Sequence, residues 1–265
     1  MTNDKHAPRT THYAIFALIA AFLALWSVPD VVAWLNRSED KAWARVQQSG
    51  VIRFAIDPSY MPFDGLGSEG VFYGIDVDLA HEIARRTGLR AEFVIAGQDS
   101  LYDVLAVGQA DATLSALIVN PTLIGRWQYS TPYFDVGQVL IKLTGSSTEI
   151  ASLAVEFGSD GDAAARHWAR RQAGIEVRPF PTADEALQAV NAGQANAAIL
   201  DAVSARQLMI KSYPQLQLDD YVTHDPLAIA VWGESTQLLV VINRALAEMQ
   251  QDGTTQRIIE AWMMK

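Results

Sequence analysis

The chain has 265 residues, of which half are hydrophobic and 19% are charged, so it can build a large core and is not generally disordered. It contains no cysteine, which excludes disulfides, thiolate metal sites and cysteine nucleophiles. The formal net charge of −10 argues against a nucleic-acid partner, because phosphate contacts need a basic face.

The amino-terminal segment has the pattern of an export signal. Residues 13–28 are almost wholly apolar and follow the basic residues Lys5 and Arg9. The run is short for a membrane span, and Ala33 offers a cleavage position. Residues 1–35 are therefore either a cleaved signal peptide or a membrane anchor built on an apolar helix. In both cases we expect the rest of the chain to lie outside the cytoplasmic membrane, in the periplasm.

Strands and helices alternate through the rest of the chain. After a helix-prone segment, 36–49, we expect a strand at 51–57, a helix at 75–87, a strand at 91–96, a helix at 100–107 and a strand at 110–117. A second series has strands at 152–157, 175–180 and 195–201 and helices at 162–172, 183–192 and 202–210. A strand at 227–232 and a helical region at 235–264, broken at Gly253, complete the chain.

This order predicts two α/β halves, joined near 137–143 and again near 227–232. Two open sheets of this kind place a ligand cleft at the carboxyl ends of their strands.

Six blocks along the chain resemble the family 3 extracellular solute-binding proteins, the polar amino-acid receptors of ABC importers. The most specific block is GIDVDLAHEIARR at 74–86. The other five are DPSYMPF at 57–63, DVLAVGQADATLSA at 103–116, STPYFDVGQVLI at 130–141, ANAAILD at 195–201 and ALAEMQQDGTTQRI at 245–258. Thr87 is a small departure from the signature. The resemblance covers about 49–265.

The resemblance implies an α/β, type II periplasmic-binding-protein clamshell with two hinge strands. One lobe would comprise 49–138 and 226–265, and the other 139–225. Such receptors close on a small ligand, and a membrane partner recognises the closed form.

Within the first lobe, the resemblance implies contacts at the end of the first strand. Asp57 stands where the family often places an acid that meets a basic ligand group, although an Asx turn before Pro58 explains it equally well. Tyr60 matches the family's stacking aromatic, which suits apolar groups or cations. Phe63 is a weaker wall candidate, because a core position explains it better.

The segment 115–130 departs from the family in a way that bears on the ligand. The arginine that would hold a ligand carboxylate falls on Leu123, and two polar contact positions fall on Ala116 and Ile118. Burying a carboxylate without a cation or several donors costs several kcal/mol. Arg126 would restore the cation if a helix beginning at Pro121 placed it one turn beyond Leu123. The alternative is an exposed surface cation.

Three residues of the second lobe complete the expected site. Asp201 matches the acid that pairs with a ligand amino group. Ser159 and Asp160 lie where the family receives the ligand carboxylate at a helix amino terminus, although capping of that helix is the simpler role for an acid there.

In the first lobe, Asp76 and Asp78 fall in the first turn of a helix, which favours a structural role over a catalytic one.

These residues predict a receptor for a small polar solute, amine-bearing or amino-acid-like, that serves an ABC permease or another inner-membrane partner. A membrane-anchored sensory or accessory module is an alternative, since an anchor and an altered carboxylate site both fit it. An enzyme is a third reading, because some cyclohexadienyl dehydratases share this fold. The sequence contains no phosphate loop, and its five dispersed histidines predict neither a metal site nor a cofactor.

Overall fold

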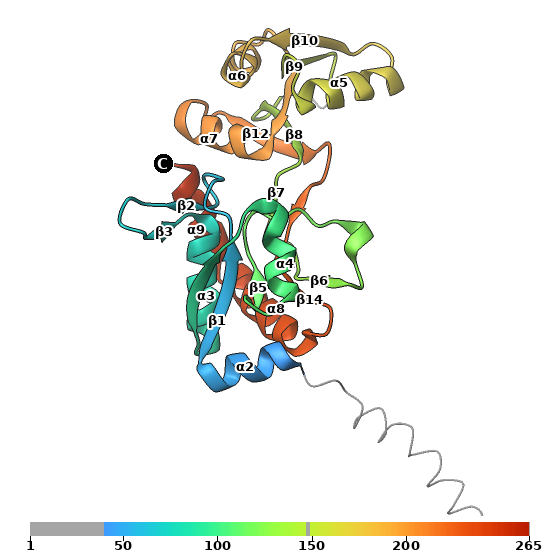
Figure 1. The fold of residues 1–265 in the computed structure, drawn as a ribbon. Helices are drawn as coiled ribbons and strands as arrows, with labels where there is room; N and C mark the ends of the chain where they lie inside the picture. Colours follow the sequence, from blue (N-terminus) through green and yellow to red (C-terminus); the bar gives the residue numbers. More distant parts are fainter. Residues whose placement is uncertain (1–39, 147–148, 265) are drawn as a thin grey trace, which may run out of the picture. The chain divides into compact units, whose positions relative to one another are not determined.

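The computed structural model describes residues 40–146 and 149–264 (Figure 1). The compact unit runs over Asp40–Lys265. The signal peptide or apolar helix expected within 1–35 lies outside the described residues. Within the described part of the chain, no helix has the length and apolar character to cross a membrane.

The first sheet has five strands in the order β4-β1-β5-β14-β6. Strand β1 pairs in parallel with β4 and β5, whereas β14 runs antiparallel to β5 and β6. The parallel trio confirms the strand–helix–strand order predicted for this half. The strands are β1 (Val51–Ile56), β4 (Arg90–Ile95), β5 (Ala112–Thr113), β6 (Trp127–Tyr129) and β14 (Ala230–Trp232).

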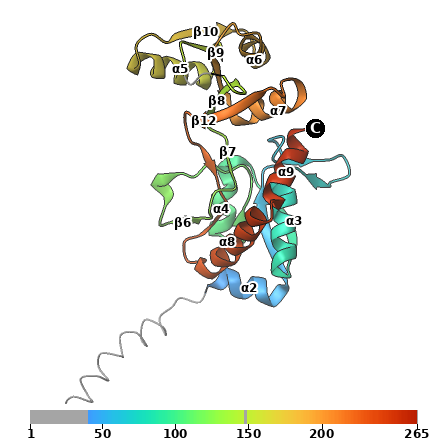
Figure 2. The ribbon, with the colours of Figure 1, turned by 180° about the vertical axis from the view of Figure 1, so that it is seen from behind.

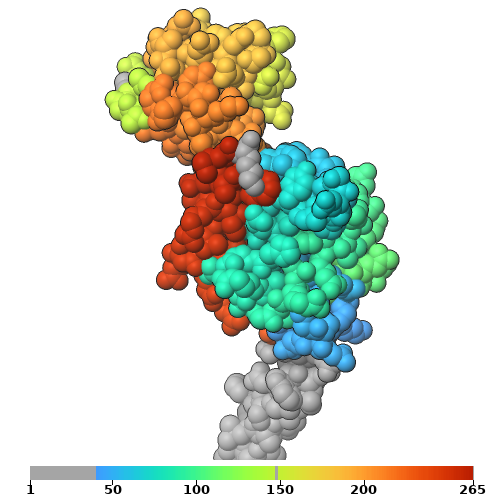
Figure 3. All heavy atoms as spheres, turned by 90° about the vertical axis from the view of Figure 1, so that its left-hand side faces the viewer, coloured from blue at the N-terminus to red at the C-terminus, as the bar shows by residue number. Residues whose placement is uncertain are grey.

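Helices cover both faces of the first sheet. Phe54 belongs to the same hydrophobic cluster as Leu79 and Ile242, whereas its neighbour Ala55 belongs to a second cluster with Leu101, as the alternation of side chains along a strand requires. Figure 2 shows α3, α8 and α9 together on one face, and Figure 3 shows α8 and α9 (red) running beside α3 (teal). The helices are α2 (Lys41–Ser49), α3 (Ile75–Thr87), α4 (Leu101–Ala106), α8 (Thr236–Gln251) and α9 (Thr254–Met263), with 3₁₀ turns at η1 (Gln98–Ser100) and η2 (Pro121–Leu123).

Helix α3 matches its predicted bounds, and a glycine limits it at each end. Gly88 takes the left-handed conformation at its C-cap. Gly74 has a φ of 134° at its N-cap, and a Cβ there would lie 2.0 Å from the carbonyl oxygen of Phe63. The close approach and the positive φ both require glycine at the start of this helix.

The second sheet has the order β10-β9-β11-β8-β12. Strands β9, β10 and β11 are parallel, and β8 and β12 add an antiparallel edge. Leu140 belongs to the same hydrophobic cluster as Ala165 of α5, whereas Val139 and Ile141 belong to the cluster that includes Leu187 of α6. The elements are β8 (Gln138–Leu143), β9 (Ser152–Glu156), α5 (Asp160–Arg171), β10 (Glu176–Phe180), α6 (Ala183–Asn191), β11 (Ala197–Asp201), α7 (Ala202–Ser212) and β12 (Leu216–Tyr221).

The chain crosses between the sheets along two short paired strands, β7 (Phe134–Asp135) and β13 (Pro226–Leu227). The carboxylate of Asp135 holds both crossings, because its Oδ1 accepts bonds of 2.9 Å from the backbone N–H groups of Gly137 and Asp225. The connections expected near 137–143 and 227–232 lie directly after these crossings, and those segments largely form β8 and β14. A separate hairpin, β2 (Gly65–Leu66) and β3 (Phe72–Tyr73), precedes α3.

Two expected elements are shorter in the structure. Of the strand predicted at 110–117, only β5 forms, because the N–H of Ala116 donates to Asp76 rather than to a neighbouring strand. The helix expected from Pro121 is a single 3₁₀ turn that ends at Leu123. It ends there because the chain then turns at Gly125, with a φ of 101°, into β6.

Candidate functional site

A hollow of about 300 Å³ lies beside the carboxyl end of β1. It brings together four of the residues nominated from the sequence, Asp57, Tyr60, Ala116 and Ile118. The remaining lining residues are Ser59, Gln98, Val136 and Leu227. Among these described lining residues, Asp57 carries the only formal charge, so the electrostatic potential of the wall is negative.

Asp57 holds the loop after β1 through its side chain and also lines the hollow. Its Oδ1 accepts a bond of 2.7 Å from the Ser59 hydroxyl, and its Oδ2 accepts one of 2.8 Å from the Gln98 N–H. These bonds fix the loop after β1, as an Asx-type turn does. The same residue lines the hollow, where it is half-buried.

Tyr60 and Phe63 form a stacked pair of which only the first ring reaches solvent. Their centroids are 5.7 Å apart with planes at 9°, and Tyr60 is 54% exposed whereas Phe63 is fully buried. Phe63 also packs edge-on against Phe134. Tyr60 therefore presents an aromatic face to the hollow, and Phe63 supports it from the core.

Two buried carboxyl groups hold the segment that forms the floor of the hollow. Asp76 accepts bonds from the Ala116 N–H at 2.5 Å and from the Tyr133 hydroxyl at 3.0 Å. Asp64 accepts a bond of 2.9 Å from the Ser115 hydroxyl. Burial raises the pKa of both carboxyls, and the charge of Asp76 raises the pKa of Asp64 further.

The network explains an unusual backbone at Ala116. This residue has a φ of 42°, which is uncommon for a residue other than glycine. Ile118 follows with 47% exposure and bridges to Leu227. The positions where the family resemblance places polar contacts thus present apolar side chains on a rigidly held loop.

Leu123 and Arg126 do not line this hollow. Leu123 packs against the core that α4 forms with the first sheet. The helix that was expected to place Arg126 one turn beyond Leu123 does not form. The expectation that this helix restores a cation to the site is therefore wrong. The guanidinium of the exposed Arg126 lies 5.8 Å from the Trp127 ring centroid instead. This places it on the outer surface as a cation–π pair.

The second-sheet candidates do not line the hollow beside Asp57 either. Ser159 is the N-cap of α5, with its hydroxyl accepting from the Asp162 N–H, and Asp160 is exposed in the first turn. Asp201 caps α7, because its Oδ1 accepts from the N–H groups of Val203 and Ser204. All three lie at the carboxyl edge of the second sheet.

Other residues beside these positions were not nominated from the sequence. Gln98 and Val136 line the hollow, and Phe157 is 71% exposed directly after β9. An aromatic residue before Gly158 is a signal that sequence reasoning passed over, whereas Gln98 and Val136 come from segments remote in the chain. Among the described residues no group of three or more His, Asp or Glu side chains is arranged to hold a metal ion.

The chain matches a family model over 52–265, and it belongs to the bacterial extracellular solute-binding proteins, family 3. Among its relatives is the histidine-binding periplasmic protein of Escherichia coli, 26% identical over 248 residues, with 85% of this chain and 91% of that protein covered. The L-cystine-binding protein TcyJ of the same organism is 24% identical, with 82% and 84% covered. The E. coli ABC transporter arginine-binding protein 1 is 25% identical, with 80% and 90% covered.

Solved structures agree on the type II periplasmic-binding-protein fold. An ancestral cationic amino acid solute-binding protein matches with a TM-score of 0.57 and 27% identity, covering 83% of this chain and 98% of that one. A mutant of an arginine-binding protein from T. maritima matches at 0.52 and 29%, covering 84% and 100%. An ancestral cyclohexadienyl dehydratase matches at 0.69 and 23%, covering 83% and 95%, and that likeness concerns the fold alone.

Proposed function

We propose that this protein captures a small amine-bearing or amino-acid-like solute between two lobes, 49–138 with 226–265 and 139–225. It would deliver the solute to an ABC permease or another inner-membrane partner. Membership of a family of extracellular binding proteins supports the receptor role. Relatives whose names specify histidine, arginine and cystine support an amino-acid-like ligand.

The observation that carries the choice of an amine is the charge around the hollow. Asp57 and the face of Tyr60 both attract a cation, and the described lining includes no arginine, lysine or histidine to neutralise a ligand carboxylate. A guanidinium or ammonium group beside Asp57 would form a charge-assisted hydrogen bond on a partly desolvated wall. A ligand carboxylate in the same place would meet repulsion.

The second lobe would contribute on closure. Asp201 uses one carboxylate oxygen to cap α7, which leaves its other oxygen for a ligand amino group. Ser159, Asp160 and Phe157 flank it at the same edge of the sheet. Strands β7 and β13 are the proposed hinge, and a ligand would shift the open–closed equilibrium by its difference in affinity for the two states.

We also propose a location for the protein. The two lobes would lie in the periplasm, and they would be tethered to the inner membrane if residues 13–28 are not cleaved off. The role is binding without turnover, and no chemical conversion of prephenate or arogenate is expected.

Isothermal titration calorimetry of the full chain against L-arginine, putrescine and L-glutamate tests the proposal. We expect arginine or putrescine to bind with one molecule per chain and glutamate to give no heat. The Asp57→Asn variant should bind the amine about tenfold more weakly or worse, since it loses a charge-assisted bond. The matched Asp99→Asn variant, an exposed acid outside the hollow, should behave as the parent does. Binding of glutamate alone overturns the proposal.

A further inference from the structure

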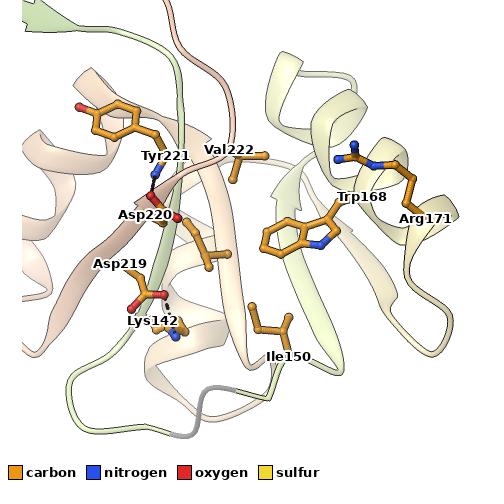
Figure 4. Close-up of a pocket in the computed structure, with 9 residues that line it drawn as sticks. Lys142, Ile150, Trp168, Arg171, Asp219, Asp220, Tyr221 and Val222 are labelled. Atoms are coloured by element: carbon orange, nitrogen blue, oxygen red, sulfur yellow. Dashed lines mark hydrogen bonds and ion pairs between the residues drawn. The ribbon is translucent and has the colours of Figure 1, made fainter.

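A larger cavity, of about 430 Å³, lies on the α5 face of the second sheet. Figure 4 shows Trp168 and Arg171 reaching it from α5, with Asp219, Asp220 and Val222 on the opposite side. Leu140, Lys142, Ile150 and Tyr221 complete its lining. Its volume falls in the range of small-molecule sites.

The cavity follows from how α5 covers the sheet. This helix packs mainly on β9, β10 and β11 and makes fewer contacts with β8, so it covers this side of the sheet less completely. Leu140 and Lys142 are two apart on β8, so both point to the same side as α5. The irregularity between Leu218 and Asp220 turns consecutive acids of β12 toward the same side.

The cavity contains one closed ion pair and two charges that remain available. The ammonium of Lys142, whose side chain is 7% exposed, lies 2.8 Å from Oδ2 of Asp219. Asp220 accepts one bond, from the Tyr221 N–H. In the described part of the chain, Arg171 makes no ion pair. A free cation on one wall and a free carboxylate oxygen on the other thus face the same space (Figure 4).

An oriented aromatic surface lies between these two charges. The Trp168 indole N–H donates to Oε1 of Gln172 at 3.1 Å, which fixes the ring. The ring packs against the apolar core beneath α5, to which Ile150 and Val222 also belong. A flat apolar group could stack on the exposed part of this ring while its polar ends meet Arg171 and Asp220.

This cavity is separate from the ligand site proposed above. Lys142 pairs across the sheet with Ala197, whereas Gln138 pairs with Asp201. Four strand residues, roughly 13 Å, separate the two positions. Trp168 likewise lies eight residues along α5 from Asp160, or about 12 Å.

We propose that this cavity is a second ligand site, for a small zwitterion with a flat apolar body, of the aromatic amino-acid class. Arg171 would bind the carboxylate, Asp220 would bind the ammonium, and Trp168 would stack on the body of the ligand. The proposal does not depend on what the hollow beside Asp57 binds.

Equilibrium dialysis of the full chain with L-phenylalanine tests the second site, with phenethylamine and 3-phenylpropionate as probes that each lack one charge. We expect phenylalanine to bind and each single-charge probe to bind about tenfold more weakly or worse. Arg171→Gln and Asp220→Asn alter exposed side chains and should each cause a similar loss, with the thermal midpoint unchanged. Arg170→Gln, the neighbouring exposed arginine outside the cavity, should change affinity less than twofold.

Three outcomes overturn the proposal. The first is the absence of phenylalanine binding at about 10 mM, a concentration at which a site with a Kd near 1 mM would be mostly occupied. The second is binding that persists in both charge variants. The third is binding that is lost in Asp57→Asn but kept in Arg171→Gln, which would locate it in the other hollow.

Discussion

The Asp76 carboxylate and the Ala116 N–H are joined by a 2.5 Å hydrogen bond that crosses from the first turn of α3 to the loop after β5. The bond holds a backbone with a φ of 42° and ends the strand that would otherwise continue through this position. The family signature at 74–86 therefore shapes the floor of the hollow without lining it. The Asp76 carboxylate, in the first turn of α3, thus also positions a loop some 40 residues later in the chain.

The buried acid pair should make stability depend on pH. Burial raises the pKa of Asp64 to about 9 and that of Asp76 to about 7, against ordinary values near 4. Between those limits the folded state binds more protons than the unfolded state does. The stability contributed by the pair is therefore complete below about pH 4 and is lost as the pH rises to about 9. The steepest decline is about 1.4 kcal/mol per pH unit for each proton.

Urea unfolding from pH 5 to pH 9 tests this expectation with the Asp64→Asn variant. The neutral amide cannot ionise and still accepts the Ser115 hydroxyl bond. The free energy of unfolding of the parent, relative to this variant, should decline across the range. Asp99→Asn is the control, because that acid is exposed. A parent that gains stability relative to Asp64→Asn toward pH 9 contradicts the assignment.

Gly74→Ala should prevent α3 from docking. The added Cβ would lie 2.0 Å from the Phe63 carbonyl oxygen at a φ of 134°, so the backbone must move. We expect a loss of several kcal/mol in the free energy of unfolding, measured by urea denaturation. Gly70→Ala is the matched control, since it has a φ of 75° but open space around the new atom, and should cost about 1 kcal/mol. Equal effects at the two positions would mean that the close approach is unimportant.

Local patterns in the sequence determine much of this fold, as α3 illustrates. Its apolar positions repeat at helical spacing and Gly88 ends it, so its bounds follow from nearby residues alone. The run at 110–117 shows the limit of that reasoning. Its alternation fits a strand, but the Ser115 hydroxyl donates to Asp64 and the Ala116 N–H donates to Asp76. These carboxyls come from other parts of the chain, so their competition with strand pairing arises only in the tertiary structure.

The candidate site also combines features that nearby residues determine with features that only the tertiary structure determines. The position of Asp57 and Tyr60 at the end of a strand could be predicted, because carboxyl ends of parallel strands meet at one edge. Gln98 and Val136 could not, since their place beside Asp57 depends on where η1 and the crossing strands return. The Lys142–Asp219 pair likewise joins strands that are adjacent in the sheet but about 77 residues apart in the chain.

Asp40→Ala should destabilise two helices that pack on the first sheet, α2 and α8, because Asp40 accepts hydrogen bonds at the start of each. The Oδ1 of Asp40 caps α2 through the Trp43 N–H, and its Oδ2 accepts from the N–H groups of Gln237 and Leu238 at the start of α8. Losing both sets of bonds should lower the free energy of unfolding by about 1–2 kcal/mol or somewhat more. Chemical denaturation measures this change in the free energy of unfolding, with Gln47→Ala in the exposed part of α2 as the control. A change as small as that of the control would show that solvent replaces these bonds.

Tyr60 offers the most direct test of the aromatic wall beside Asp57. Truncation in Tyr60→Ala removes the ring face but leaves the core intact, because the side chain is 54% exposed and Phe63 fills the space behind it. A cation over an aromatic ring contributes about 0.5–2 kcal/mol, so affinity for L-arginine in calorimetry should fall roughly twofold to thirtyfold.

Tyr60→Phe keeps the ring and removes only the hydroxyl, so its affinity should stay within about twofold of the parent. Thermal midpoints of both variants should match that of the parent, since neither change reaches the buried ring of Phe63. If Tyr60→Ala binds arginine as tightly as the parent, the ring does not face the ligand. If Tyr60→Phe loses as much affinity as Tyr60→Ala, the hydroxyl rather than the aromatic face makes the contact, and the preference for cations then rests on Asp57 alone.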